Sequence, residues 1–208
     1  MSPSDRDRFL RWLEEAGPAM GENQVRQLLD FGALVLAAAP RLGLISRGDR
    51  ERFLMRHVRE SLWVVKLGLA CASTRILDVG SGAGLPGIPI AIAVPECDVT
   101  LVEPKRKRAG FLDRCALALK LSNVRVEART LVLVSGDRKW DTAVSRGLSW
   151  TASMADSLSH LVVESGALLR FGPRDTAVKG VRILPTGEGE PRGIQVWPRA
   201  SWPELPRS

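Results

Sequence analysis

The 208-residue sequence has few of the residues that build disulfide frameworks or metal sites. Its three cysteines, Cys71, Cys97 and Cys115, lie far apart with no C-x-x-C pair, and only two histidines accompany them. We therefore expect reduced thiols in the cytoplasm, no disulfide framework and no metal. No apolar run is long enough to span a bilayer, and residues 1–17 are too charged for a signal peptide, so no membrane association is expected.

Aromatic residues are also scarce, while positive charge is in excess. Tyrosine is absent and aromatics make up 5% of the chain, which argues against base-stacking platforms of the RRM kind. Thirty Lys and Arg against 23 Asp and Glu give a net charge of +7. This balance favours a polyanionic partner such as nucleic acid, although an arginine-rich, high-GC proteome would also produce it.

Apolar periodicity divides the chain into a helical part and a mixed part. Residues 1–72 are predicted to form a helical cap with helices at 4–16, 22–39 and 49–69. Pro40 is expected to end the second helix, and residues 40–48 are expected to form a loop. Residues 73–198 alternate short β-rich runs with helical patterns, which predicts an α/β domain with helices on both faces of a parallel sheet. Residues 199–208 are expected to form a flexible tail.

The boundaries predicted within the mixed part follow from the same patterns. Five strands are expected at 75–79, 99–103, 124–127, 141–145 and 166–171. Helices are expected at 85–93, 105–120 and 151–163, and a closing antiparallel hairpin from 177–184 and 193–197.

The most informative stretch is the glycine-rich turn after the first predicted strand, Ile76–Gly87 (ILDVGSGAGLPG). Gly82, Gly84 and Gly87 form a literal G-x-G-x-x-G, so a dinucleotide site must be considered. Asp78 at the end of the strand argues against it, because a carboxylate there would repel a pyrophosphate. It suits a cofactor that carries an ammonium and a sulfonium, such as S-adenosylmethionine. The glycines permit positive φ and close approach of the backbone to a ligand.

Glu103 stands at the end of the second predicted strand, about twenty residues further on, where an acid can accept hydrogen bonds from both ribose hydroxyls of a nucleoside. The ordinary alternatives are a tight strand-to-helix turn and a solvated acid. The residues predicted to hold the cofactor on these grounds are Asp78, Gly80, Gly82, Gly84 and Glu103.

The run Asp78–Pro89 resembles the signature of the RsmG (GidB) family, bacterial methyltransferases of 16S rRNA, and its distinctive part is Leu85–Pro89. The resemblance extends over residues 28–171 with the family's spacing kept. Further matches are Arg56-His57 with Glu60-Ser61, Lys107-Arg108 with Phe111-Leu112, and Ser145-Arg146.

This resemblance implies a Rossmann-like class I S-adenosylmethionine-dependent methyltransferase with an N-terminal helical extension. It implies methyl transfer to N7 of one guanine in 16S rRNA, either naked or in a small-subunit particle, and we expect the enzyme to be a monomer. Arg146 becomes the candidate catalytic residue. Carried over by position, the cofactor contacts are Gly80, Ser81, Leu85, Thr130, Leu131 and Arg146.

The chemistry of guanine N7 agrees with the residues present. N7 offers a lone pair and has no proton to lose, so proximity, orientation and desolvation can suffice without a general base. Methylation of cytosine C5 would need a thiolate nucleophile, and neither Cys97 nor Cys115 follows a proline in an active-site loop. Amino-group methylation normally shows an Asp/Asn-Pro-Pro-aromatic run where this chain reads SRGL at 145–148.

Seven basic residues are predicted to form a track for an RNA backbone. The ordinary alternative for any one of these residues is that it lies on a solvated helix face. For Arg146, the candidate catalytic residue, the ordinary alternative is a surface ion pair. Three fall on one face of the helix predicted at 49–69, and four open the helix predicted at 105–120: Arg52, Arg56 and Arg59, then Lys105, Arg106, Lys107 and Arg108.

Three segments depart from the family pattern. After the third predicted strand, where relatives usually carry an acidic pair or Ala-Glu, this chain has Arg129-Thr130-Leu131. Residues 43–46 read Gly-Leu-Ile-Ser in place of Asn-Leu-Thr-Ser, and the fifth predicted strand does not match the family's terminal lysine cleanly. A shifted target or reduced activity therefore stays open. So do two other functions: a methyltransferase for small molecules, and an RNA-binding protein with a vestigial cofactor pocket.

Overall fold

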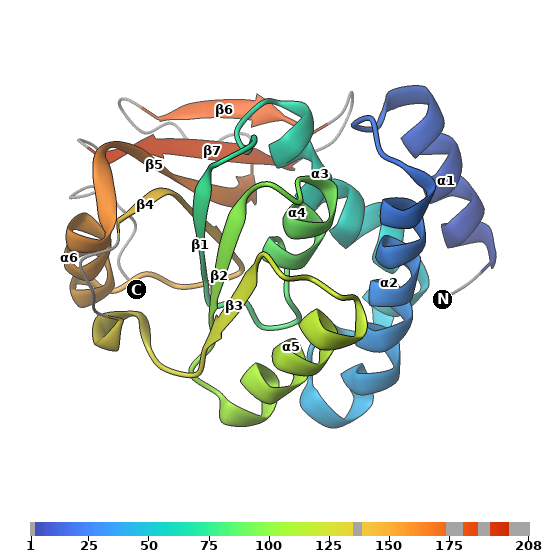
Figure 1. Ribbon diagram of the computed structural model, residues 1–208, viewed down its shortest axis with the longest axis horizontal. Coiled ribbons are helices and arrows are strands. Elements are labelled where there is room, and N and C mark those ends of the chain that lie inside the picture. The colour runs from blue at the N-terminus through green and yellow to red at the C-terminus, as the bar shows by residue number, and fades with distance from the viewer. Residues whose placement is uncertain (1–2, 135–138, 174–180, 187–191, 200–208) are drawn as a thin grey trace.

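A seven-stranded sheet forms the centre of the computed structural model, which describes residues 3–134, 139–173, 181–186 and 192–199 (Figure 1). The strand order is β3-β2-β1-β4-β5-β7-β6, with β1 to β5 parallel and β7 antiparallel to both β5 and β6. The α/β class and the closing hairpin are thereby confirmed. The strands are β1 (Arg75–Val79), β2 (Asp98–Val102), β3 (Val124–Glu127), β4 (Trp140–Arg146), β5 (Val162–Pro173), β6 (Arg182–Pro185) and β7 (Arg192–Pro198).

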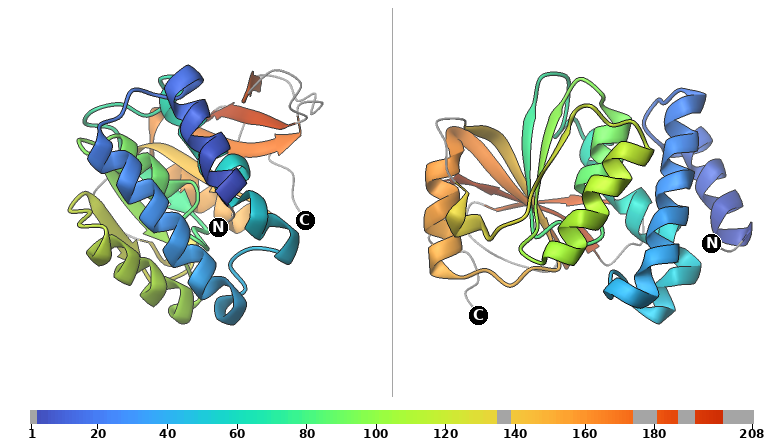
Figure 2. Two further views of the ribbon diagram at one scale, coloured as in Figure 1. Left: turned by 90° about the vertical axis from the view of Figure 1, so that its right-hand side faces the viewer. Right: turned by 60° about the horizontal axis from the view of Figure 1, so that its bottom comes forward.

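Helices cover both faces of this sheet (Figure 2). Successive strand residues point to opposite faces, so Ile76 packs into one apolar cluster and Leu77 into the other. The first cluster lies under α1 (Pro3–Ala16), α2 (Glu22–Leu42), η2 (Leu54–Val58), α3 (Arg59–Lys66), α4 (Gly87–Ala93) and α5 (Arg106–Ala118). The 3₁₀ segment η1 (Arg47–Arg52), between α2 and η2, contributes no buried residue. The second lies under η3 (Leu131–Leu133) and α6 (Ala152–Leu161).

The N-terminal helices are joined to the sheet domain by a shared core and by hydrogen bonds. Phe31 of α2 and Phe53 pack in the same cluster as Ile88 of α4. The Gln24 amide donates to the carbonyls of Ile92 and Ala93 at distances of 2.9 and 3.0 Å. These carbonyls belong to the end of α4, where intrahelical partners run out. The division of the chain at residue 72 stays a prediction.

Two predicted helix boundaries were wrong. Pro40 does not end the second helix, which runs on to Leu42 because a proline in the last turn forfeits only one backbone hydrogen bond. Gly43 ends it in the left-handed conformation, at φ 58°, with its N–H donating to the Ala39 carbonyl. The helix predicted at 49–69 is instead a 3₁₀ segment (η1), a π-helical turn (η2) and the short helix α3.

The other elements agree with the sequence to within a few residues, apart from β5, which starts at Val162 directly after α6. The predicted segment 177–180 and residues 200–208 of the predicted tail lie outside the described residues. Within the described part, no helix is long and apolar enough to cross a membrane.

Candidate functional site

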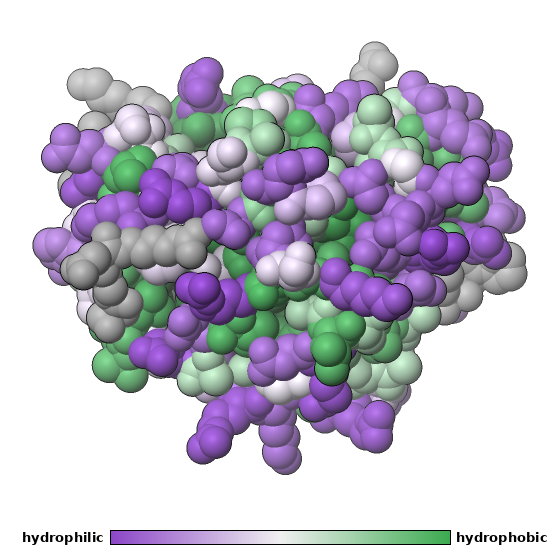
Figure 3. Space-filling model, in the orientation of Figure 1, coloured by the Kyte–Doolittle hydropathy of each residue, from purple (hydrophilic) through white to green (hydrophobic). Residues whose placement is uncertain are grey.

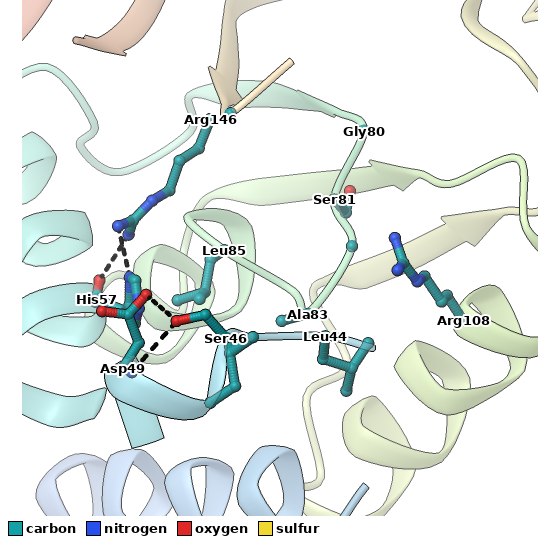
Figure 4. A pocket seen from close by; sticks show the side chains of 13 residues that line it. Leu44, Ser46, Asp49, His57, Gly80, Ser81, Ala83, Leu85, Arg108 and Arg146 are labelled. Atoms are coloured by element: carbon teal, nitrogen blue, oxygen red, sulfur yellow. Dashed lines mark hydrogen bonds and ion pairs between the residues drawn. The ribbon is translucent and has the colours of Figure 1, made fainter. Parts of the chain in front are cut away.

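A cavity of about 330 Å³ opens beside the turn between β1 and α4 (Figure 4). β1 lies between β2 and β4, so this edge of the sheet is the switch point where α/β domains bind ligands. The cavity is lined by Leu44, Ile45, Ser46, Asp49, His57, Gly80, Ser81, Gly82, Ala83, Leu85, Arg108, Arg146 and Gly147.

The turn depends on its glycines. Gly80, Gly82 and Gly84 have φ values of 74°, 55° and 89°, in the left-handed region that other residues rarely adopt. Gly87 is required for a different reason. A Cβ there would lie 2.4 Å from Leu101 Cδ2 and 2.7 Å from Asp78 Oδ2, which leaves no room for a side chain.

Asp78 lies fully buried beneath the turn. Its Oδ2 accepts a hydrogen bond from the Gly87 N–H at 2.9 Å, while its Oδ1 has no hydrogen-bond partner among the described residues. Burial raises the pKa of Asp78 to about 7, the Gly87 N–H opposes this rise, and the charge of Glu103 adds to it. A buried carboxylate with an unsatisfied oxygen suits a cationic ligand, so the residues present fit the cofactor that the sequence predicts.

Glu103 is buried just beyond the end of β2, with only 3% of its surface exposed, and is not a solvated acid. Its two carboxylate oxygens accept from the N–H groups of Gly82, at 3.0 Å, and Lys105, at 2.8 Å. The side chain therefore ties the glycine-rich turn to the start of α5. Both oxygens keep further lone pairs with which ribose hydroxyls could bond.

Arg146 ends β4, and its side chain points toward His57 of the helical segments (Figure 4). Its Nη2 lies 2.7 Å from Glu60 Oε2 and within hydrogen-bond distance of His57 Nδ1. His57 Nε2 is in turn 3.7 Å from Asp49 Oδ2. The cavity wall thus holds the guanidinium inside a network of charged and polar side chains.

The seven basic residues predicted for RNA do not form one uniform set. Lys105, Arg106 and Lys107 are exposed at the start of α5. Arg108 is half-buried and donates to the carbonyls of Leu42 at 3.2 Å and Gly43 at 2.8 Å, which closes the end of α2.

Arg52 and Arg56 pair with Asp49, and Arg59 is half-buried. Because the segment changes from 3₁₀ to π to α geometry, sequence spacing does not give these three arginines a common face.

The cavity wall includes only some of the predicted cofactor residues. Gly80, Ser81, Gly82, Leu85 and Arg146 line it. Asp78, Gly84, Glu103, Thr130 and Leu131 lie outside the wall, and Leu131 packs into the apolar cluster under α6.

Leu44, Ile45, Ser46 and Asp49 line the cavity and were missed as site residues. The departure of residues 43–46 from the family pattern was the signal that marked this loop. Among the described residues, no group of three or more His, Cys, Asp or Glu side chains could hold a metal ion.

Comparison with known proteins places these features in context. A family model described as "rRNA small subunit methyltransferase G" (GidB) matches residues 24–174. The chain is 34% identical over 155 residues to ribosomal RNA small subunit methyltransferase G of Pseudomonas aeruginosa, covering 74% of this chain and 72% of that one. It is 34% identical over 196 residues to the protein of that name from Rubrobacter xylanophilus, covering 86% and 74%.

Among solved structures, the S-adenosylmethionine-dependent methyltransferase SibL in its apo form superposes with a TM-score of 0.60. The sequence identity is 12%, and the match covers 94% of this chain and 74% of that one. At this identity the likeness concerns the fold, and it confirms the predicted class I methyltransferase architecture.

The raised pKa of Asp78 predicts a pH-dependent stability. The pKa of Asp78 in the folded protein lies above the ordinary 3.8, so the protonated side chain favours the folded state. This contribution to the free energy of unfolding is fully present below pH 3.8 and is lost as the pH rises through about 7. Between these limits the wild type should lose up to about 1.4 kcal/mol per pH unit relative to Asp78→Asn. Urea unfolding from pH 5.5 to 8.5 measures this. The exposed Asp156→Asn variant should follow the wild type, and parallel curves for Asp78→Asn and wild type would refute the assignment.

Proposed function

The chain belongs to the rRNA small subunit methyltransferase G (GidB) family, and we propose that the cavity beside its β1–α4 turn is where a methyl group passes from S-adenosylmethionine to N7 of a guanine in 16S rRNA. The enzyme class, the cofactor and the rRNA substrate follow from the family. The observation that carries the site assignment is the turn itself, in which three glycines of positive φ lie above a buried carboxylate with an unsatisfied oxygen.

The residues around the turn offer complementary contacts to each part of the cofactor. Asp78 would place a carboxylate oxygen without a hydrogen-bond partner beneath the cationic methionine end, and the Gly80–Leu85 backbone would allow close approach. Glu103 would accept from the ribose hydroxyls. Thr130 and Leu131 would flank the adenine beyond the cavity.

Methyl transfer needs little more from the protein than position. S-adenosylmethionine supplies an electrophilic methyl group on a sulfonium. With the cofactor held by Asp78, the Gly80–Leu85 turn and Glu103, the N7 lone pair would form the new N–C bond while the electrons of the S–C bond go to sulfur, so the positive charge would pass to the base. No proton is transferred. The protein must align the base with the methyl group and exclude water.

Arg146 is the residue we assign to the acceptor side. It is positioned at the cavity wall by Glu60 and His57, and a guanidinium there can donate to guanine O6 or to an rRNA phosphate. Such a contact orients the base without removing a proton.

RNA would approach along the exposed basic start of α5. On the face shown in Figure 3, hydrophilic side chains cover the upper part of the side where α1 and α2 lie, as they do the opposite side, and apolar side chains show below them. We further propose that the enzyme acts as a monomer in the cytoplasm, on naked rRNA or on a small-subunit particle.

One observation favours a second candidate. Ile45 lines the cavity at the position where the family usually has a threonine, which is compatible with an RNA-binding protein whose pocket has lost activity. Against it, Asp78 and Glu103 are both retained and both buried.

Replacing a single basic residue at the start of α5 should weaken RNA binding and its salt dependence together. Arg106→Ala should reduce the slope of log affinity against log salt by about one, as expected for the loss of one phosphate contact. Arg114→Ala, an exposed arginine further along the same helix, is the matched control and should leave the slope unchanged. Equal slopes for the two variants would contradict the proposed RNA track.

Deletion of the gene should remove one 7-methylguanosine from 16S rRNA. Mass-spectrometric mapping of rRNA from the deletion strain detects the missing mark, and the wild-type gene supplied in trans should restore it. An unchanged map would favour the small-molecule or vestigial-pocket alternatives.

A further inference from the structure

The first helix reaches the machinery around Arg146, and we propose that Asp5 is a positioning residue of the methyl-transfer site. α1 (Pro3–Ala16) lies before the residues 24–174 that the family model matches. It nevertheless packs against η2, and its Phe9 is fully buried in the core. The inference rests on the proposed function, because it concerns the same site.

Asp5 is buried, with only 3% of its surface exposed, although it lies on the outermost helix. Its Oδ2 accepts from the N–H of Leu54 at 2.8 Å, and its Oδ1 accepts from the N–H of Met55 at 3.1 Å. One carboxylate therefore holds two consecutive backbone donors from a segment 49 and 50 positions away in the sequence.

Those two donors belong to an unusual piece of backbone. At the junction of the 3₁₀ segment η1 and the π-helical turn η2, the spacing of the helical hydrogen bonds changes. Directly after η2, the Arg59 N–H donates to the Leu54 carbonyl, five residues back. A π turn inside a helix is rare and often occurs at functional sites. An acceptor from outside the segment is what fixes where this turn begins.

The same turn carries the partners of Arg146. His57 lies in η2 and Glu60 one turn later in α3, and both contact Arg146 Nη2. A shift of η2 would therefore move both contacts together and carry the guanidinium away from its place at the cavity. Because a displacement of about 1 Å can lower the rate of catalysis by about a hundredfold, Asp5 can affect methyl transfer without touching cofactor or RNA.

The test compares Asp5→Asn with Asp7→Asn in the full-length protein. The amide keeps the size of the side chain but removes its charge and one of the two acceptors, and Asp7 is an exposed residue of the same helix. With small-subunit rRNA that lacks the mark, kcat of Asp5→Asn should fall by about tenfold to a hundredfold. The Kd for S-adenosylmethionine should not change, and Asp7→Asn should behave as wild type. Wild-type kcat in Asp5→Asn would overturn the proposal.

A double-mutant cycle with Arg146→Lys separates positioning from general stability. If Asp5 acts through Arg146, Asp5→Asn should lower kcat little further once Arg146 is replaced. An equal fold-loss in both backgrounds would mean that Asp5 only stabilises the fold, and the proposal would be wrong.

If Asp5→Asn does not fold, the same cycle is run with Asp5→Glu. Its extra methylene displaces both oxygens, and an equal loss in both backgrounds, or no loss, again overturns the proposal.

Hydrogen exchange provides a readout that does not need activity. Asp5→Asn should speed exchange of the amides of residues 54–61, whereas Asp7→Asn should not. If the wild type transfers no methyl group to rRNA, the proposed function fails, and this measurement still tests the link between Asp5 and the turn. Unchanged exchange at residues 54–61 would refute that link.

Discussion

The architecture of the site depends on one buried hydrogen bond, from the Gly87 N–H to the Asp78 carboxylate. It fixes where the chain leaves β1 and where α4 begins, and it forces residue 87 to be glycine because a Cβ would collide with the carboxylate. A buried charge with only part of its hydrogen-bonding capacity satisfied is destabilising in the free protein. The same charge lowers the free energy of the folded protein when a cation lies nearby. The free protein is therefore less stable at this position than the protein with its cationic ligand bound.

The surroundings of the turn are held by contacts from distant parts of the chain. Glu103 ties the turn to α5, Arg108 closes the end of α2, and Arg146 bonds to the helical segment that Asp5 supports. The N-terminal helices therefore do more than cover the sheet. They supply one wall of the cavity and place the charged residues on it.

Much of the sheet domain was predictable from the sequence, because the alternation of strand and helix and the run Asp78–Gly87 reflect local rules of backbone geometry. The partners of Arg108 and Arg146 were not, since they lie 66 and 89 positions away in the sequence. The π turn at Leu54–Val58 was also missed, because its apolar residues keep ordinary helical spacing. The end of α2 was predicted wrongly because Pro40 is the strongest local signal for a helix end in this segment. The helix instead continues to Gly43, three residues later.

Calorimetric titration with S-adenosylmethionine tests the central claim most directly, that the β1–α4 turn holds the cofactor. The wild type should bind, and Gly80→Val should not, because Gly80 lines the cavity with φ 74° and a Cβ there would lie 3.3 Å from Leu148 Cδ1. Gly68→Val is the matched control, since Gly68 has φ 69°, open space around it and no place in the cavity wall, and it should bind as the wild type does. Normal binding by a folded Gly80→Val variant, or no binding by the wild type, would contradict the account.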